Sequence, residues 1–142
     1  MLQQASTTLR IRAPAPGLHD ITGQVSGWLD SQRLGAGLLT IFCAHTSASL
    51  LIQENAAGAA RRDLEAFFER IAPEDPSLYT HNDEGPDDMP AHIRSALTQT
   101  ELSIPVRGGK MVLGTWQGIF LFEHRRDAPL REITLHLLGE EA

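Results

Sequence analysis

Two histidines bracket an acidic segment near the middle of the chain. The segment reads His81-Asn82-Asp83-Glu84-Gly85-Pro86-Asp87-Asp88-Met89-Pro90-Ala91-His92. Imidazoles beside carboxylates are a donor set that suits a divalent metal ion. A glycine and two prolines separate the histidines, so the two rings cannot share one helix face and would meet only where the loop folds back on itself.

A third imidazole follows an apolar run, in Cys43-Ala44-His45-Thr46-Ser47. Three imidazoles with one open coordination position would make a reactive, zinc-like site. His92 is expected in the first turn of a helix, whose positive end keeps the ring neutral and its lone pair available. We therefore predict that His45, His81 and His92 bind one divalent ion. The alternative for each histidine alone is a ring whose nitrogens are satisfied by neighbouring backbone groups.

Glu54 is the candidate catalytic base of such a site. It follows a predicted strand, and its carboxylate would take a proton from a metal-bound water. The neighbouring Asn55 is better explained as the cap of the next helix. The four carboxylates between the two histidines have two explanations, a solvated loop or a set that orients the ligands or holds a second, harder cation. They belong to Asp83, Glu84, Asp87 and Asp88.

Two further segments carry side chains that suit a substrate. Gly114-Thr115-Trp116-Gln117-Gly118 interrupts a β run, and its indole ring and amide either line a pocket or pack a subunit interface. Arg125 ends an apolar strand and could receive a phosphate, although a charged strand end is the commoner explanation. The candidate substrate-binding residues are Thr46, Ser47, Trp116, Gln117 and Arg125.

Cys43 is the only cysteine of the chain. One interpretation is a nucleophile with His45 as its base. The apolar neighbours Ile41 and Phe42 instead predict a buried thiol, which is inert because loss of solvent raises its pKa. Ser47 lacks the glycine-flanked setting of a nucleophile elbow, so a serine hydrolase has little support.

Composition narrows the class of protein. A chain of 142 residues predicts one domain, 1–142, and a net charge of −6 with scattered Lys and Arg residues does not provide the basic stripe of a nucleic-acid-binding protein. A single cysteine excludes an internal disulfide framework, and the first residues lack an apolar leader, which predicts a cytoplasmic protein. The longest clean apolar run, Leu38 to Ala44, is far shorter than the ~20 residues needed to cross a bilayer.

The candidate residues need elements that hold them in place. Alternating and β-branched residues predict strands over 7–13, 38–44, 49–53, 102–106, 110–113, 119–123 and 133–138, with 38–44 buried on both faces. Helical spacing predicts helices from Asp20 up to Gly35, over 61–71, and from Asp87 or Asp88 to about Thr98, the last one capped by an aspartate. Gly108-Gly109 predicts a turn. Together these elements predict a single compact α+β domain with about three helices and a mostly antiparallel sheet.

Several spaced motifs together resemble one known family. They are Cys43-Ala44-His45-Thr46-Ser47-Ala48-Ser49-Leu50, Gln53-Glu54-Asn55, Arg62-Asp63-Leu64-Glu65, His81 through His92, and Gly114-Thr115-Trp116-Gln117-Gly118. In this order they resemble the YjbQ-like family, also called secondary thiamine-phosphate synthase enzymes, and the likeness covers nearly the whole chain.

The resemblance implies a compact α+β fold, a homotrimer, and a pocket in which His45, His81 and His92 hold a metal ion. It also implies weak thiamine-phosphate synthase activity, which joins an aminopyrimidine diphosphate to a thiazole phosphate and releases pyrophosphate. In that reaction a cation neutralises the leaving diphosphate. Three imidazoles favour a zinc-like ion, whereas a diphosphate usually goes to Mg²⁺ on carboxylates.

Two other classes of function stay open. One is a metal-dependent hydrolase or lyase, in which Glu54 or Asp83 moves the proton of a metal-bound water. The other is a trimeric binding or scaffold protein whose metal ion is structural. A structural zinc site is closed by four protein ligands, so a fourth ligand from His124 or Cys43 would favour the scaffold.

Overall fold

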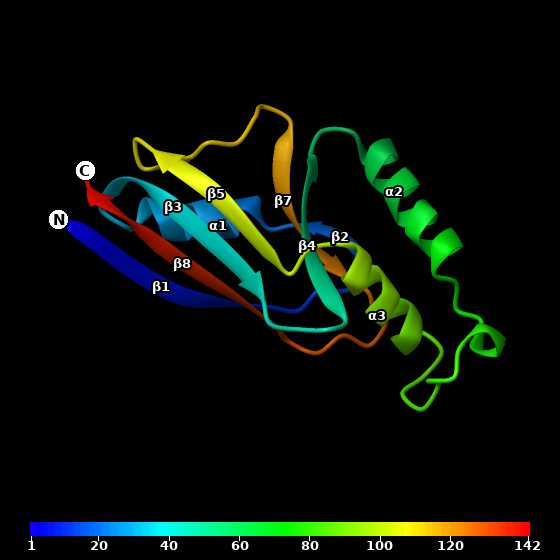
Figure 1. Ribbon diagram of the computed structural model, residues 1–142. Helices are drawn as coiled ribbons and strands as arrows, with labels where there is room; N and C mark the ends of the chain where they lie inside the picture. The colour runs from blue at the N-terminus through cyan, green and yellow to red at the C-terminus, as the bar shows by residue number, and fades with distance from the viewer.

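The computed structural model describes residues 1–142 and contains two antiparallel sheets and three α-helices (Figure 1). In chain order the elements are β1 (Leu2–Ile11), β2 (Gly17–Asp20), α1 (Thr22–Asp30), β3 (Leu34–Cys43), β4 (Ala48–Glu54), α2 (Gly58–Ile71), the short helix η1 (Pro76–Leu78), α3 (Asp88–Leu97), β5 (Glu101–Arg107), β6 (Lys110–Met111), β7 (Gln117–Glu123) and β8 (Arg131–Glu141). The predicted α+β class is confirmed. None of the helices combines the length and the apolar character needed to span a membrane.

The larger sheet has five strands in the order β1-β8-β3-β5-β6, and every neighbouring pair is antiparallel. Alternate residues of each strand face a common core, as the period of two requires. On β3 these are Leu39, Ile41 and Cys43. The same core of 17 buried residues includes Val25 of α1 and Leu50 of β4, so the helix and the second sheet cover one face of the larger sheet.

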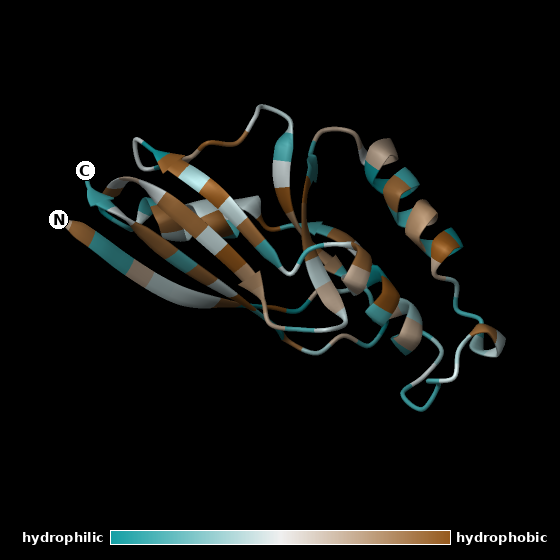
Figure 2. Cartoon of the chain, viewed as in Figure 1, coloured by the Kyte–Doolittle hydropathy of each residue, from teal (hydrophilic) through white to brown (hydrophobic).

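The other face of the larger sheet differs from the prediction. The apolar run over 38–44 predicts burial on both sides, but Leu38 and Phe42 are each 45% exposed. Leu138 of β8 pairs with Leu38 and is exposed beside it. Figure 1 views this open face, which no other element of the chain covers, and Figure 2 shows hydrophobic residues along it. A continuous apolar run therefore does not show by itself whether one or both faces of a strand are covered.

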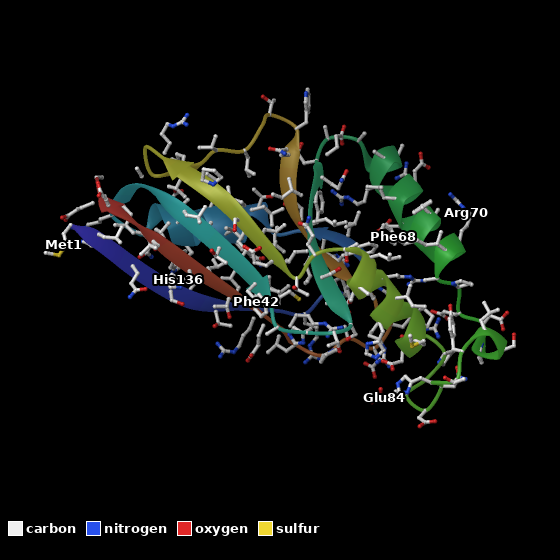
Figure 3. The ribbon with its side chains drawn as sticks, viewed as in Figure 1. Met1, Phe42, Phe68, Arg70, Glu84 and His136 are labelled. Carbon is white, nitrogen blue, oxygen red and sulfur yellow. The ribbon has the colours of Figure 1, made fainter.

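The smaller sheet has the order β2-β7-β4, with the almost fully buried β7 at its centre. α2 packs against one side of this sheet through Leu64 and Phe68. The Phe68 ring lies edge-on to Phe122 of β7, with 5.2 Å between ring centroids. Figure 3 shows Phe68 on the sheet side of α2 and Arg70 on its outer side.

Two strand boundaries show what pairing adds to local sequence. β2 occupies residues 17–20, where the sequence predicts no strand, because the segment pairs with β7. β1 starts at Leu2 instead of Thr7, because it pairs with β8 along its whole length. The predicted turn at Gly108 and Gly109 is confirmed, since both residues have positive φ (59° and 75°) and join β5 to β6.

α3 begins at Asp88 as expected, but no carboxylate caps it. Asp87, at the N-cap position, makes no side-chain hydrogen bond to the helix. Its Oδ2 instead accepts a hydrogen bond from the backbone N–H of Arg126 (2.9 Å) and lies 3.2 Å from Nε of Arg125. The start of α3 is therefore fastened to the segment that follows β7, and this junction supports the candidate site.

Candidate metal site

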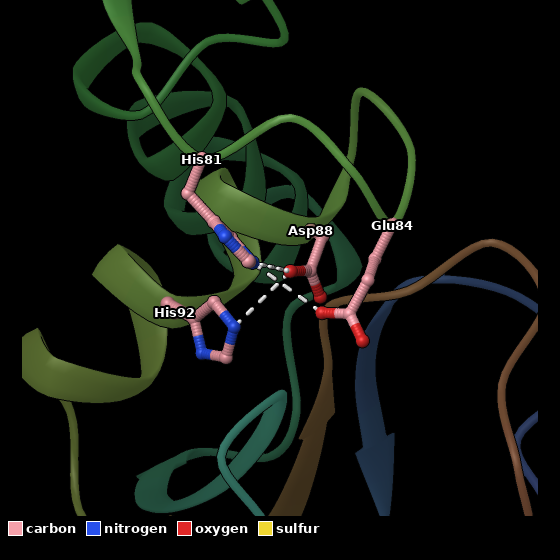
Figure 4. Close-up of side chains that lie close together, drawn as sticks. All are labelled: His81, Glu84, Asp88 and His92. Atoms are coloured by element: carbon pink, nitrogen blue, oxygen red, sulfur yellow. Dashed lines mark hydrogen bonds and ion pairs between the residues drawn. The ribbon is translucent and has the colours of Figure 1, made fainter.

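Four side chains converge at the start of α3 (Figure 4). We call them the metal-ligand group, which consists of His81, Glu84, Asp88 and His92. One potential ligand atom from each residue lies within 4.8 Å of the others. His81 and Glu84 come from the loop before the helix, and Asp88 and His92 occupy successive turns of one helix face. The loop does fold back as the spacing of the two histidines requires, and their ring centroids are 5.9 Å apart.

Asp88 lies at the centre of this group. Its side chain is 3% exposed, and its Oδ2 is 3.0 Å from Nε2 of His81 and 3.2 Å from Nε2 of His92. Its Oδ1 accepts a hydrogen bond from Nη1 of Arg125 (2.7 Å). Both oxygens of a buried carboxylate are thus engaged, as its burial demands.

The local sequence explains how the loop delivers His81 to the helix. Gly85 has φ of 106°, which side-chain-bearing residues rarely adopt, and its N–H donates to the Asn82 carbonyl (3.4 Å). The Asn82 amide donates to the carbonyls of Pro76 and Tyr79, which ties the loop to the short helix before it. From Asp88 onward the helical repeat places a residue four positions later on the same face, which brings in His92.

The group is electrostatically suited to hold a cation. Burial alone raises the pKa of Asp88, but hydrogen bonding with Glu84 and the charges of His92 and Arg125 outweigh it and hold the pKa below its usual value. Hydrogen bonds to Asp88 and Glu84 raise the pKa of His81. The carboxylate is therefore ionised at neutral pH and both imidazoles face it with Nε2.

The donor set fits a divalent metal ion. Two imidazole nitrogens with one or two carboxylate oxygens are ligands that zinc and similar ions accept, and carboxylates also admit Mg²⁺. Arg125 donates a hydrogen bond to the Asp88 oxygen that faces away from the histidines, and metal ligands are commonly oriented by such a contact. Asp83, one of the four predicted carboxylates, is exposed and is not in the group.

His45 is not in the group either. Its Nε2 accepts a hydrogen bond from the backbone N–H of Glu132 (2.8 Å). Burial, helped by the charge of Arg131, lowers its pKa, so the ring is neutral and carries its proton on Nδ1. Neither nitrogen has a free lone pair in this arrangement. His45 and Thr46 instead share with His92 the wall of a shallow depression of about 290 Å³.

The predicted base Glu54 lies at the other end of the smaller sheet. Glu54 pairs with Gln117 at one end of β4, and Ala48 pairs with Glu123 at the other end, beside the metal-ligand group. At 3.3 Å per residue, β4 therefore places Glu54 about 20 Å from the group. The carboxylate of Glu54 accepts hydrogen bonds from Ala56 and Ala57 N–H (3.0 and 2.8 Å) ahead of α2. Within one chain Glu54 is a turn-stabilising residue and does not reach the group.

The predicted substrate residues fall into separate places. Trp116 is 62% exposed and lies with Gln117 at the Glu54 end, where the Gln117 side chain accepts a hydrogen bond from Gly114 N–H. The Ser47 carbonyl accepts from Arg131 Nη2 (3.0 Å). Arg125 is not free for a phosphate, because Asp87, Asp88 and the Glu84 carbonyl engage its guanidinium.

Neither proposed fourth ligand joins the group. Cys43 is buried, and burial raises its pKa to about 11, which confirms the prediction of an inert thiol. His124 is buried with Nε2 2.9 Å from the Ser49 hydroxyl. The sequence did not predict Glu84 and Asp88 as direct members of this group. The available signal was the four-residue spacing of Asp88 and His92, which places both on one helix face.

Several known proteins are similar to this chain in sequence and in fold. The sequence profile described as "UPF0047 protein YjbQ-like" matches residues 7–140. A UPF0047 protein of Synechocystis is 46% identical over 138 residues (97% of this chain and 94% of the relative), and YjbQ of Escherichia coli is 44% identical over 134 residues (94% and 96%). A YbjQ-like protein of Sulfolobus solfataricus has a crystal structure that superposes with a TM-score of 0.89 at 29% identity, covering 99% and 100% of the two chains.

The matched residues 7–140 include the whole metal-ligand group and both sheets except the start of β1 and the last residue of β8. The predicted resemblance is thus confirmed at the level of the family. The chain belongs to the YjbQ-like UPF0047 family.

Proposed function

We propose that this protein is a divalent-metal-dependent enzyme whose ion is held by His81, Asp88 and His92, with Glu84 beside them. The observation that carries the proposal is the approach of two imidazole Nε2 atoms to one buried carboxylate oxygen, at 3.0 and 3.2 Å. An ion at this point would displace the Nε2 protons that now face Asp88 and would bind the lone pairs of both Nε2 atoms. Glu84 is largely exposed and is therefore the ligand that a substrate or water would replace most easily.

The reaction proposed for this site is the one that the family resemblance implies. It is the condensation of an aminopyrimidine diphosphate with a thiazole phosphate, with release of pyrophosphate. The bound ion supplies charge neutralisation for the leaving diphosphate. The carboxylates of Asp88 and Glu84 support this assignment, because they give the site oxygen ligands that Mg²⁺ accepts as well as zinc.

A second candidate is a metal-dependent hydrolase or lyase. It is favoured by the engagement of the nearby cations, since Arg125 is held by Asp87 and Asp88, and Arg126 is ion-paired with Glu74. A site without free cations handles a diphosphate poorly. In this alternative Glu84 moves the proton, in place of Glu54, which lies at the other end of the sheet.

We also propose that the protein is a homotrimer, as the resemblance implies. The exposed apolar side chains of Leu38, Phe42 and Leu138 on the open face of the larger sheet support self-association. A second subunit could bring residues to the depression beside His92 that one chain does not supply.

The first test is metal binding. Untagged protein is freed of metal and titrated with Zn²⁺ and, separately, with Mg²⁺ in a calorimeter. We expect one ion per chain, and we expect His92→Ala and Asp88→Asn to lose at least about 100-fold in affinity, because direct ligands matter more than the supporting residues, whose loss costs 10–100-fold. The control is His19→Ala, a histidine on β2 that lies outside the group and outside the larger sheet. Equal affinities in His92→Ala and His19→Ala would reject the site.

The second test is activity. Wild type and His92→Ala, prepared identically, are supplied with the two phosphorylated substrates, and pyrophosphate release is measured with and without added metal. We expect slow, metal-stimulated release that the variant lacks. Equal rates from both preparations would mean that a contaminating synthase is being measured, and the hydrolase or lyase would then become the leading candidate.

A further inference from the structure

A second cavity lies on the other side of α3 from the metal-ligand group. Its volume is about 380 Å³, and its lining consists of prolines and polar or charged residues, chiefly Glu69, Pro73, Glu74, Arg94, His124 and Arg126. His92 and Arg94 are two positions apart on α3, so their side chains leave the helix about 200° apart at 100° per residue. The two sites therefore use opposite faces of one helix.

The floor of this cavity contains a cation without a counter-ion. Arg94 is 8% exposed, and its guanidinium makes one protein hydrogen bond, from Nη2 to the Ala72 carbonyl (2.8 Å). Its Nε is buried without a partner, and no carboxylate pairs with the side chain. Burial lowers the pKa of Arg94, and the charges of Glu69 and Glu74 oppose this shift without forming an ion pair with the guanidinium. Buried charges are normally paired, and an unpaired one costs several kcal/mol in typical proteins.

His124 supplies a second unpartnered polar group at the same floor. It is 1% exposed, its Nε2 contacts the Ser49 hydroxyl, and its Nδ1 has no partner. Burial, with the nearby charges of Arg94 and Arg131, lowers its pKa to about 3, so the ring is neutral at pH 7. The floor thus carries one positive charge and two polar nitrogens that no protein group satisfies.

The rim of the cavity carries a net negative charge. Arg126 and Glu74 form an ion pair and neutralise each other. Glu69 also lines the cavity, is exposed, and makes no hydrogen bond or ion pair. One free cation at the bottom and one free carboxylate at the rim match a ligand with the opposite arrangement of charges. A dianionic phosphate would meet repulsion from Glu69.

We propose that this cavity, the Arg94 pocket (Glu69, Glu74, Arg94, His124 and Arg126), binds a small carboxylate-bearing molecule of amino-acid size. The carboxylate accepts hydrogen bonds from the guanidinium of Arg94, whose planar donors match it, and an ammonium group of the same molecule faces Glu69. The proposal goes beyond the metal-dependent activity and does not depend on it.

The test is an NMR titration of the full-length ¹⁵N-labelled protein with acetate and with glycine. Metal is first removed with 1,10-phenanthroline, a chelator that carries no carboxylate. We expect a saturable shift of the Arg94 Nε–H signal while that of the exposed Arg107 stays in place. Glycine should bind about two- to fivefold more tightly than acetate, the gain of one exposed ion pair with Glu69. A larger effect from inorganic phosphate than from either carboxylate would overturn the assignment.

Three variants make the test specific, with the His124 ring signals as readout. Arg94→Gln should abolish saturation, and Arg107→Gln, with the same change in net charge, should not. Because Arg94 also binds the Ala72 carbonyl and its loss could disturb folding, Glu69→Gln provides an independent check. It should keep acetate binding and remove the advantage of glycine. Unchanged acetate affinity in folded Arg94→Gln, or an unchanged glycine advantage in Glu69→Gln, would contradict the proposal.

Discussion

At the scale of single residues, Asp88 connects the two halves of the candidate metal site. One oxygen faces His81 and His92, and the other accepts from Arg125. We therefore expect Arg125 to fix the orientation of Asp88 in the proposed metal site. This differs from the substrate-binding role that its position at the end of an apolar strand suggests.

The first prediction concerns this positioning. Arg125→Gln should lower metal affinity about 10–100-fold, the usual effect of losing a residue that orients a ligand. Competition with a fluorescent chelator measures the affinity, and circular dichroism verifies the fold. Arg107→Gln, which removes the same charge elsewhere, is the matched control. If both variants bind the ion as wild type does, Arg125 has no role in the site.

The second prediction concerns His124 and pH. Its folded-state pKa of about 3 lies below the ordinary value of 6.5, so the unfolded chain binds one more proton between these values. Stability should therefore fall as pH drops from 6.5 toward 3, by up to about 1.4 kcal/mol per pH unit from this group. Urea unfolding at pH 7 and pH 5 measures the slope.

The comparison for that slope is His124→Gln, which cannot titrate. The variant is expected to be less stable at pH 7, because it loses the Ser49 contact and the packing against Phe122. Its stability should nevertheless change less between pH 7 and pH 5. An identical slope in both proteins would assign the acid sensitivity to other groups.

At the scale of elements, the turn at Gly85 decides whether the ligands meet. His81 and Glu84 precede it, and Asp88 and His92 follow it. A backbone with φ of 106° is strained for any residue with a Cβ, and a Cβ at this position would also lie 3.4 Å from Oδ1 of Asp87. The loop and α3 thus form one unit whose geometry depends on a single glycine.

The third prediction follows from this turn. Gly85→Ala should destabilise the fold by about 1 kcal/mol or more and weaken metal binding, because the loop ligands are displaced from the helical ones. Gly23→Ala is the control, since Gly23 lies in α1 with open space around its Cα and ordinary φ. That variant should be neutral or slightly stabilising. Thermal unfolding measures the change in stability, and metal titration measures the change in affinity.

At the scale of the whole molecule, the larger sheet leaves an apolar face uncovered while the metal-ligand group lies at the far end of the chain's fold (Figure 1). α1 and the smaller sheet occupy only one side of the larger sheet. Leu38, Phe42 and Leu138 on the open side expose apolar surface to water, and the proposed trimer would cover them.

The fourth prediction is therefore a change of assembly. Wild type should have the mass of a trimer by light scattering at micromolar concentration, and Phe42→Glu should shift it toward the single-chain mass by placing a charge on the open face. Leu78→Glu replaces a more exposed apolar residue away from the sheet and should leave the mass unchanged. A single-chain mass for wild type would reject the trimer.

The sequence by itself determined the class of fold and the chemical character of the site. Alternation and helical spacing located all three helices and seven of the eight strands, because these patterns follow directly from the periods of the two backbones. The missed strand, β2, depends on pairing with β7, which local sequence does not contain. The pairing of His81 with His92 and the inert Cys43 were also predictable, from spacing in one case and apolar neighbours in the other.

Only the tertiary structure decided which groups share the site. It brings Asp88 and Glu84 to the two histidines, occupies the Nε2 of His45 with the Glu132 backbone, and keeps Glu54 at the opposite end of β4. Sequence spacing carries no information on these distances, because they depend on strand register and on how a loop closes onto a helix. The unpaired Arg94 on the other face of α3 is a further example. Its charge is visible in the sequence, but the lack of a partner appears only when the surrounding elements are in place.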